Sequence, residues 1–259
     1  MPLPEYKNAL VREASPKYAA FYAPRGIKIN EELAHHQHAA YTQALRDAGL
    51  HVTTIPAHPQ LHDCVFIEDT AVVWDRRALI TCMTPLREGE QREVERWLAG
   101  NGFDIVHLPA GARIEGGDVM HLEDATYVGL TERTNTAGVE ALRKFLAPFE
   151  RTVHGVSVPR CLHLKSAMTY LGDRTILISP ALIDFEVPEG YSRLEVPAAE
   201  AHAGNALRIG ETILFAAGFP QTSKTLSQFA RAHQCRLVEM EISEYQKGDG
   251  AITCSSILF

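Results

Sequence analysis

A cysteine near the C-terminus is the strongest candidate for a reactive side chain in this sequence. Cys254 stands at the head of a short apolar run that ends the chain, and similar runs follow Glu68, Glu115, His163 and Asn205. A thiolate, an imidazole and a carboxylate together can act as nucleophile, base and orienting group. A neighbouring histidine also lowers the pKa of a cysteine and can give a proton to a leaving group. We therefore predict that Cys254 is a nucleophile, with His163 and Glu115 beside it.

The same positions bring several carboxylates to one place. Glu68 is followed by Asp69, and Glu115 is followed by Asp118 three residues later. Like charges raise one another's pKa, so such a cluster is costly unless a cation lies among the carboxylates. A guanidinium group has a planar fork of donors that matches paired carboxylates. The predicted chemistry is therefore attack of a cysteine sulfur on the central carbon of a guanidinium-type substrate.

The elements that must position these side chains recur along the chain. The five head positions, 68, 115, 163, 205 and 254, are separated by 42 to 49 residues, and a helix, a strand and a hairpin recur with them. A period of this size is typical of repeat architectures. We predict one α/β domain over residues 1–259, built as a ring of five units whose head residues meet at the axis. The units are expected at about 27–81, 82–130, 131–179, 180–216 and 217–259, with a strand at 8–12 closing the ring.

Hydrophobic spacing and stop signals predict the helices of these units. The four expected helices are 30–48, 87–99, 136–149 and 223–233, while 181–185 replaces a full helix in the fourth unit. His163 is expected to lead directly into a strand that ends at Leu171. Residues 12–26 are expected to form a long aromatic loop, and loops of this length often cover sites.

Charge and composition exclude several classes of protein. The formal net charge is −7 and no run of Lys or Arg stands out, which argues against a binder of nucleic acid or of anionic membranes. The five cysteines are scattered without a CxxC pair, which favours a reducing compartment. The first seven residues lack a signal-peptide layout, and no apolar run approaches the roughly 18 residues of a membrane span. We expect a cytoplasmic protein.

Other groups of ionisable residues receive simpler interpretations. His35, His36 and His38 are expected on a solvated helix surface, because no carboxylate or cysteine stands at a matching spacing. Cys161 and His163 offer too few ligands for a structural zinc site. The acidic and basic residues between 88 and 96 are expected to form a solvated helix face. We predict neither a metal site nor a cofactor.

Six stretches, in order and over nearly the whole chain, resemble the dimethylarginine dimethylaminohydrolase (dimethylargininase) family. They are Phe66–Val73 (FIEDTAVV), Glu115–Asp118 (EGGD), Val128–Asn135 (VGLTERTN), His163–Ser166 (HLKS), Ala217–Pro220 (AGFP) and Asp249–Ser256 (DGAITCSS). The resemblance implies the five-fold α/β propeller called the pentein fold, which the amidinotransferases and arginine deiminases share. It also implies hydrolysis of Nω-methylated arginine to citrulline and methylamine or dimethylamine, through a covalent thiouronium intermediate and without a cofactor.

The resemblance also implies roles for individual residues. Cys254 would be the nucleophile, His163 the general acid and base, and Glu115 the carboxylate that orients His163 or holds the substrate. The residues expected to bind the small guanidino substrate are Asp63, Glu68, Asp69, Arg87, Arg133 and Gly248. Of these, Glu68 and Asp69 would hold the guanidinium with Asp63 nearby, Arg133 and Arg87 would bind a carboxylate, and Gly248 would lie near the amino-acid end. Residues 17–23 and 82–86 depart from the family pattern.

Three other functions remain open at this point. A deiminase of free arginine or of another guanidine is one, although arginine deiminases usually carry Asp where this chain has Lys165, and they contain an added helical insert. An amidinotransferase is another, although those chains are generally longer. The third is a non-catalytic pentein that acts as a binding protein, although such proteins lack the Cys, His and Glu set. The oligomeric state is expected to be a monomer or a homodimer.

Overall fold

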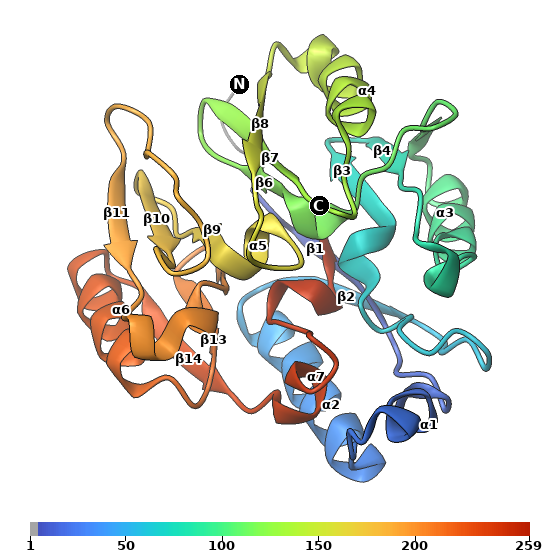
Figure 1. Ribbon diagram of the computed structural model, residues 1–259, viewed down its shortest axis with the longest axis horizontal. Coiled ribbons are helices and arrows are strands. Elements are labelled where there is room, and N and C mark those ends of the chain that lie inside the picture. Colours follow the sequence, from blue (N-terminus) through green and yellow to red (C-terminus); the bar gives the residue numbers. More distant parts are fainter. Residues whose placement is uncertain (1–4) are drawn as a thin grey trace.

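Five three-stranded sheets surround a common centre in the computed structural model, which describes residues 5–259 (Figure 1). In each sheet the strand that follows a head residue pairs antiparallel with a middle strand, and the middle strand pairs in parallel with an outer strand. The predicted α/β fold of five repeated units is therefore confirmed. The expectation of no signal peptide falls partly on residues 1–4, which lie outside the described residues.

The sheets follow one another along the chain, except that the last sheet uses both ends of it. Four sheets consist of β3 (Ala71–Trp74), β4 (Arg77–Ile80) and β5 (Asp104–His107); β6 (Val119–His121), β7 (Ala125–Leu130) and β8 (Thr152–Ser157); β9 (Met168–Tyr170), β10 (Thr175–Ile178) and β11 (Ser192–Glu195); and β12 (Ala206–Ile209), β13 (Thr212–Ala216) and β14 (Arg236–Met240). The fifth sheet consists of β15 (Ile257–Leu258), β1 (Asn8–Arg12) and β2 (His51–Ile55). In it Leu10 is opposite Ile257, so the two chain ends complete one sheet.

The longer helices lie outside the ring of sheets (Figure 1). They are α2 (Glu31–Asp47), α3 (Gln91–Gly100), α4 (Thr136–Leu146) and α6 (Pro220–Ala232). Side-chain caps fix the start of two of them, because Asn30 accepts a hydrogen bond from the Leu33 amide and Asn135 accepts one from the Gly138 amide. No helix in the described part of the chain combines the length and apolar character needed to cross a membrane.

Shorter helices mark where local structure differs from the sequence-based expectation. Residues after His163 form a helical turn, α5 (Leu164–Ala167), before β9 begins, and the expected loop at 12–26 contains α1 (Tyr18–Tyr22). The fourth unit has no helix at 181–185, and its only helical segment is the 3₁₀ turn η6 (Ala198–Ala203). The remaining short elements are α7 (Ser243–Gln246), η1 (Ala23–Arg25), η2 (Ile67–Thr70), η3 (Pro85–Arg87), η4 (Gly116–Asp118), η5 (Ala147–Phe149) and η7 (Thr253–Ser255).

Two expectations of solvated surface are wrong. His38 is buried on the inner face of α2, where burial lowers its pKa to about 4, although His35 and His36 are exposed. Glu90 is fully buried, because it faces the guanidinium of Arg87 instead of solvent. Helical spacing alone does not show which charged residues become buried when the rest of the chain packs against them.

Candidate active site

The five head residues occupy the same place in each unit, immediately before the inner strand. Asp69 and Glu68 lie in η2 before β3, Glu115 precedes η4 and β6, and His163 precedes α5 and β9. Asn205 directly precedes β12, and Cys254 lies in η7 before β15. The repeat therefore brings side chains from five distant segments to the same end of the inner strands.

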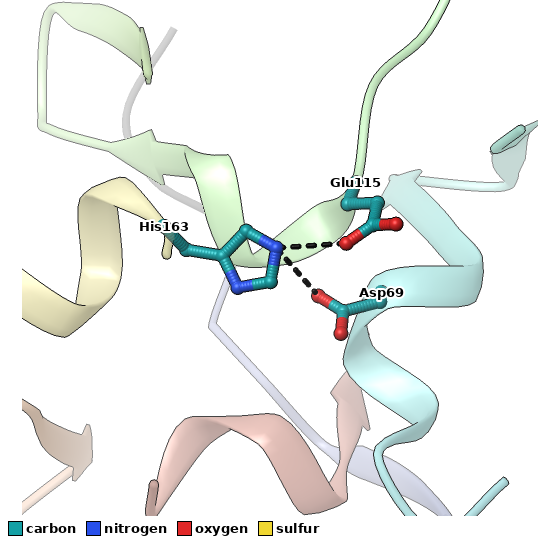
Figure 2. Close-up of side chains that lie close together, drawn as sticks. All are labelled: Asp69, Glu115 and His163. Atoms are coloured by element: carbon teal, nitrogen blue, oxygen red, sulfur yellow. Dashed lines mark hydrogen bonds and ion pairs between the residues drawn. The ribbon is translucent and has the colours of Figure 1, made fainter. Parts of the chain in front are cut away.

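The central contact is a histidine held by two carboxylates (Figure 2). His163 Nε2 lies 2.8 Å from Glu115 Oε2 and 3.9 Å from Asp69 Oδ1. All three side chains are nearly completely buried. A Cβ atom on Gly117 would lie 2.7 Å from His163 Nδ1 and 2.9 Å from Asp69 Oδ1, so only glycine fits between them. The Gly117 amide instead donates a hydrogen bond to Asp69 Oδ1 (3.0 Å).

Asp118 holds the backbone that carries His163. Its carboxylate accepts hydrogen bonds from the Leu164 amide (2.9 Å) and from the hydroxyls of Thr131 (2.8 Å) and Thr134 (2.6 Å). Asp118 is fully buried, and burial raises its pKa. Asp118 therefore acts as a structural acceptor that fixes the start of α5, one residue after His163.

The charges around His163 favour its protonated form. Burial alone would lower the pKa of His163, but the negative charge of Asp69 and the hydrogen bond to Glu115 outweigh it and raise the pKa to about 9. Burial would raise the pKa of Asp69, but the positive charges of His163 and Arg87 lower it overall. At neutral pH the site therefore contains a protonated imidazole beside an ionised Asp69.

Ligand atoms of Asp69, Glu115 and His163 lie within 4.8 Å of one another, a spacing that suits a small cation. The two carboxylates can also accept hydrogen bonds from an organic cation such as a guanidinium.

Cys254 is partly buried, and its surroundings favour the thiol over the thiolate. Its sulfur accepts a hydrogen bond from the Ala251 amide (3.4 Å). Burial raises the pKa of Cys254, and the negative charges of Glu68 and Asp69 raise it further. A cation bound among these carboxylates would reverse that effect and favour the thiolate.

The two candidate arginines have different surroundings. Arg87 is only 7% exposed and donates to Asp69 Oδ2 (2.7 Å), Glu90 Oε2 (2.9 Å) and the Phe66 carbonyl (3.0 Å). Arg133 is more exposed, donates to Thr84 Oγ1 (3.1 Å), and lies 3.5 Å from Glu115 Oε1. Arg87 therefore holds Asp69 from inside the protein, whereas Arg133 is a partly exposed cation beside Glu115.

Glu68 has partners other than His163. One of its oxygens forms an ion pair with Lys165 and the other accepts from Thr253 Oγ1 (2.8 Å). Thr253 is held in turn by Asn205, which also bonds the carbonyl of Lys165. A cavity of about 630 Å³ is lined by Glu68, Lys165 and Thr253 but not by Cys254, His163 or Glu115. We place the chemistry at the buried cluster of Asp69, Glu115 and His163, because the reactive set predicted from the sequence does not line this cavity.

Asp63 and Gly248 face each other through an aromatic side chain. Tyr22 donates a hydrogen bond to Asp63 Oδ1 (2.9 Å) and its hydroxyl lies 3.4 Å from the Gly248 carbonyl oxygen. A Cβ atom on Gly248 would lie 2.7 Å from the Tyr18 hydroxyl, so the aromatic residues of α1 pack directly on this backbone. The side chains of α1 therefore bring Asp63 and Gly248 together.

Sequence reasoning missed four residues that contact the predicted site. Tyr22 lies in a segment expected to cover a site, but its contact with Asp63 had no sequence signal. Lys165 and Thr253 adjoin His163 and Cys254 in sequence, which was the available signal for their place at the axis. Glu90 belongs to the Arg87–Glu90 stretch, where a spacing of three residues allows an ion pair.

Solved structures share this fold and this type of site. The chain superposes on dimethylarginine dimethylaminohydrolase from Pseudomonas aeruginosa, a cysteine-to-serine mutant in complex with citrulline, with a TM-score of 0.89, 25% identity and coverage of 99% and 100% of the two chains. A histidine-to-glycine variant of a dimethylarginine dimethylaminohydrolase, an adduct with S-methyl-L-thiocitrulline, gives a TM-score of 0.88, 25% identity and coverage of 98% and 100%. The fold is the pentein fold, and the protein is a hydrolase of this fold class.

Sequence comparisons identify the family within that class. The family model for N,N dimethylarginine dimethylhydrolase, eukaryotic, matches residues 17–257. The N(G),N(G)-dimethylarginine dimethylaminohydrolase of Streptomyces coelicolor is 35% identical over 254 residues, which cover 97% of this chain and 96% of that protein. The enzyme of the same name from Pseudomonas aeruginosa is 30% identical over 233 residues, 86% and 87% of the two chains. This chain belongs to the dimethylarginine dimethylaminohydrolase family.

Proposed function

We propose that this protein hydrolyses Nω-methylated arginines, dimethylarginine and monomethylarginine, to citrulline and the corresponding amine. One observation carries the proposal: His163 lies between the buried carboxylates of Glu115 and Asp69, and Thr253, the residue before Cys254, donates a hydrogen bond to Glu68, the residue before Asp69. This arrangement offers a nucleophile, a proton donor and acceptors for a cation within one site.

The guanidinium of the substrate fits the acceptors that face His163. Glu115 Oε1 is fully buried and has no hydrogen-bond partner within residues 5–259, and Asp69 is ionised beside it. Arg133 Nη1 lies 3.5 Å from this oxygen without forming a hydrogen bond to it, so a closer guanidinium N–H would supply the missing hydrogen bond. Glu68 adds negative charge, although both of its oxygens already have donors.

A second group of residues would bind the amino-acid end of the substrate. Arg133 is the candidate for binding the substrate carboxylate, because its side chain is partly exposed beside Glu115. Arg87 would have to give up one of its present acceptors to reach the same group. Asp63 and the Gly248 carbonyl offer acceptors for the substrate ammonium group, under α1.

The reaction then proceeds in two halves. The bound cation lowers the pKa of Cys254, whose thiol loses its proton to solvent, and the thiolate attacks the guanidinium carbon and forms a C–S bond. His163 gives its proton to the departing methylamine or dimethylamine as the C–N bond breaks, which leaves a planar thiouronium. Neutral His163 then takes a proton from water, the oxygen attacks the same carbon, and the C–S bond breaks to release citrulline. No oxidant or reductant is needed.

Substrate comparison tests the function. We expect citrulline formation from dimethylarginine and monomethylarginine to exceed formation from arginine, with no ureido product from agmatine. Preference for arginine would identify a deiminase, and transfer of the amidino group to an added amine would identify an amidinotransferase. No turnover of any guanidine by folded protein would contradict an enzymatic role and favour a binding protein.

A further inference from the structure

The cavity of about 630 Å³ lies on the axis of the ring. It is lined by residues from the inner strand of every sheet, among them Val73 of β3, Met120 of β6, Thr169 of β9, Leu207 of β12 and Ile257 of β15. Lys7 and Gly210 also line it and are exposed, so the cavity reaches the surface. Gly210 follows β12 whereas the head residue Asn205 precedes it, so this opening lies at the end of the inner strands opposite the head residues.

At its other end the cavity meets a layer of hydrogen-bonded polar side chains. Glu68, Lys165 and Thr253 line this end. Glu68 forms an ion pair with Lys165 and accepts a hydrogen bond from Thr253 Oγ1 (2.8 Å). Thr253 directly precedes Cys254 in the chain. We call Glu68, Lys165 and Thr253 the polar layer.

The polar layer is thin, because successive residues of one segment face the cavity and the reactive cluster. Glu68 lines the cavity, and the next residue, Asp69, lies 3.9 Å from His163 Nε2. Gly116 lines the cavity too, and the amide of the next residue, Gly117, donates a hydrogen bond to Asp69 Oδ1 (3.0 Å). The cavity therefore ends one residue away from the groups assigned to the chemistry.

The ion pair in this layer can part without leaving a charge in a dry interior. The side chains of Lys165 and Glu68 are 16% and 12% exposed, and both line the cavity. Lysine has a flexible four-carbon stem, so its ammonium group can move toward the cavity and be solvated there. A pair whose members stay hydrated is held weakly, in contrast to a pair in a dry interior.

The proposed reaction needs an exchange of small molecules between its two halves. After the C–N bond breaks, methylamine or dimethylamine lies beside the thiouronium, and the rest of the substrate stays attached to the Cys254 sulfur. That remainder still fills the route by which the substrate entered. The amine must leave, and a water molecule must arrive before His163 can take a proton from it. Because His163 has given its proton to the nitrogen, the amine leaves as a neutral molecule.

We propose that the axial cavity is the path by which the amine leaves and water enters, and that the ion pair of Glu68 with Lys165 opens to let them pass. This inference rests on the proposed function, because it supplies the step between the two halves of that reaction. It gives the cavity and the polar layer a role in the exchange of the leaving group for water.

Obstruction of the cavity tests the inference. Val73 and Leu207 are half-buried and line the cavity from different sheets. Val73→Trp and Leu207→Trp narrow the cavity at two separate places and leave the polar layer and the reactive cluster unchanged. In each variant kcat for dimethylarginine should fall about tenfold, because exit of the amine becomes rate-limiting. The fall in kcat for monomethylarginine should be smaller, because methylamine is the smaller product.

Val238→Trp is the matched control, because Val238 is also half-buried but lies in the outer strand β14 and does not line the cavity. This control should change kcat for the two substrates by the same factor. Lys165→Arg tests the opening of the ion pair. Arginine keeps the charge and can hold Glu68 through two parallel hydrogen bonds, so kcat for dimethylarginine should again fall more than kcat for monomethylarginine.

Circular dichroism and the thermal midpoint show which variants are folded, and either folded tryptophan variant is sufficient for the test. An unchanged kcat in such a variant, or an equal loss for the two substrates, would overturn the proposed path. A wild-type kcat in Lys165→Arg would overturn the role of the ion pair. A wild-type protein that hydrolyses neither methylated arginine would instead contradict the proposed function, and the inference with it.

Discussion

His163 Nε2 and Glu115 Oε2 are 2.8 Å apart, although the two residues are separated by 48 positions in the chain. Each precedes the inner strand of its own sheet, so the contact exists only when neighbouring units of the ring are assembled. The contact does two things at once. It orients the imidazole, and with Asp69 it keeps the imidazole protonated at neutral pH.

The first prediction concerns Glu115. Glu115→Gln preserves the shape but removes a negative charge from His163, so kcat should fall about 100-fold, as expected for impaired acid–base catalysis. The alkaline limb of the pH–rate profile should also move to lower pH, because the pKa of His163 is less raised. Glu95→Gln is the matched control, since Glu95 makes the same kind of contact with the exposed His107. An unchanged pH profile in Glu115→Gln would contradict the assigned role.

The second prediction concerns the nucleophile. Cys254→Ser should abolish turnover, because a serine hydroxyl is far harder to ionise than a thiol in the same place. Circular dichroism and the thermal midpoint should match wild type. Cys235→Ser is the control and should retain full activity. Among the hydrogen bonds described, the Cys235 sulfur contacts only the His233 carbonyl. Substantial turnover by Cys254→Ser would refute the assignment.

The third prediction separates the two arginines. Arg87→Met leaves Asp69 and Glu90 buried without their cation, so the free energy of unfolding should fall by about 3–5 kcal/mol. Arg133→Met should lower the free energy of unfolding by less than about 1 kcal/mol, because this side chain is 26% exposed. It should raise KM, because Arg133 is the candidate for binding the substrate carboxylate. Urea titration and steady-state kinetics measure the two effects. Equal loss of stability in both variants would show that both arginines are structural.

The fourth prediction follows from the raised pKa of His163. Its pKa is about 9 in the folded protein, above its ordinary value of 6.5, so the protonated form stabilises the fold. This stabilisation is fully present below pH 6.5 and is lost as the pH rises through about 9. The free energy of unfolding should therefore fall by about 3 kcal/mol over this interval. His163→Gln should lack that fall, and an identical slope in both proteins would contradict the raised pKa.

Local pattern was sufficient to predict the ring and the order of its head residues. The positions of Glu115, His163 and Cys254 could be predicted because each head residue adjoins its own strand, and equivalent strands converge at one end. The helices that cover the sheets were predicted to within a few residues for the same reason.

Contacts between units could not be predicted in this way. The family resemblance implies that Glu68 holds a guanidinium, and the structure adds a contact that had no sequence signal, the ion pair with Lys165 from another unit. The sequence predicts Glu90 as one of several charges on an exposed helix face, whereas in the structure Glu90 is buried against Arg87. Tyr22 of α1 donates a hydrogen bond to Asp63, which is 41 positions away, and no rule of sequence spacing predicts this contact.

The central claim is that Cys254 forms a covalent intermediate which His163 is needed to resolve. His163→Gly should be mixed with dimethylarginine, quenched with acid, digested and examined by mass spectrometry. We predict that the peptide containing Cys254 gains the mass of the substrate less dimethylamine, and that citrulline does not accumulate. Unmodified Cys254 in protein that has bound substrate, or an adduct on another cysteine, would contradict the account.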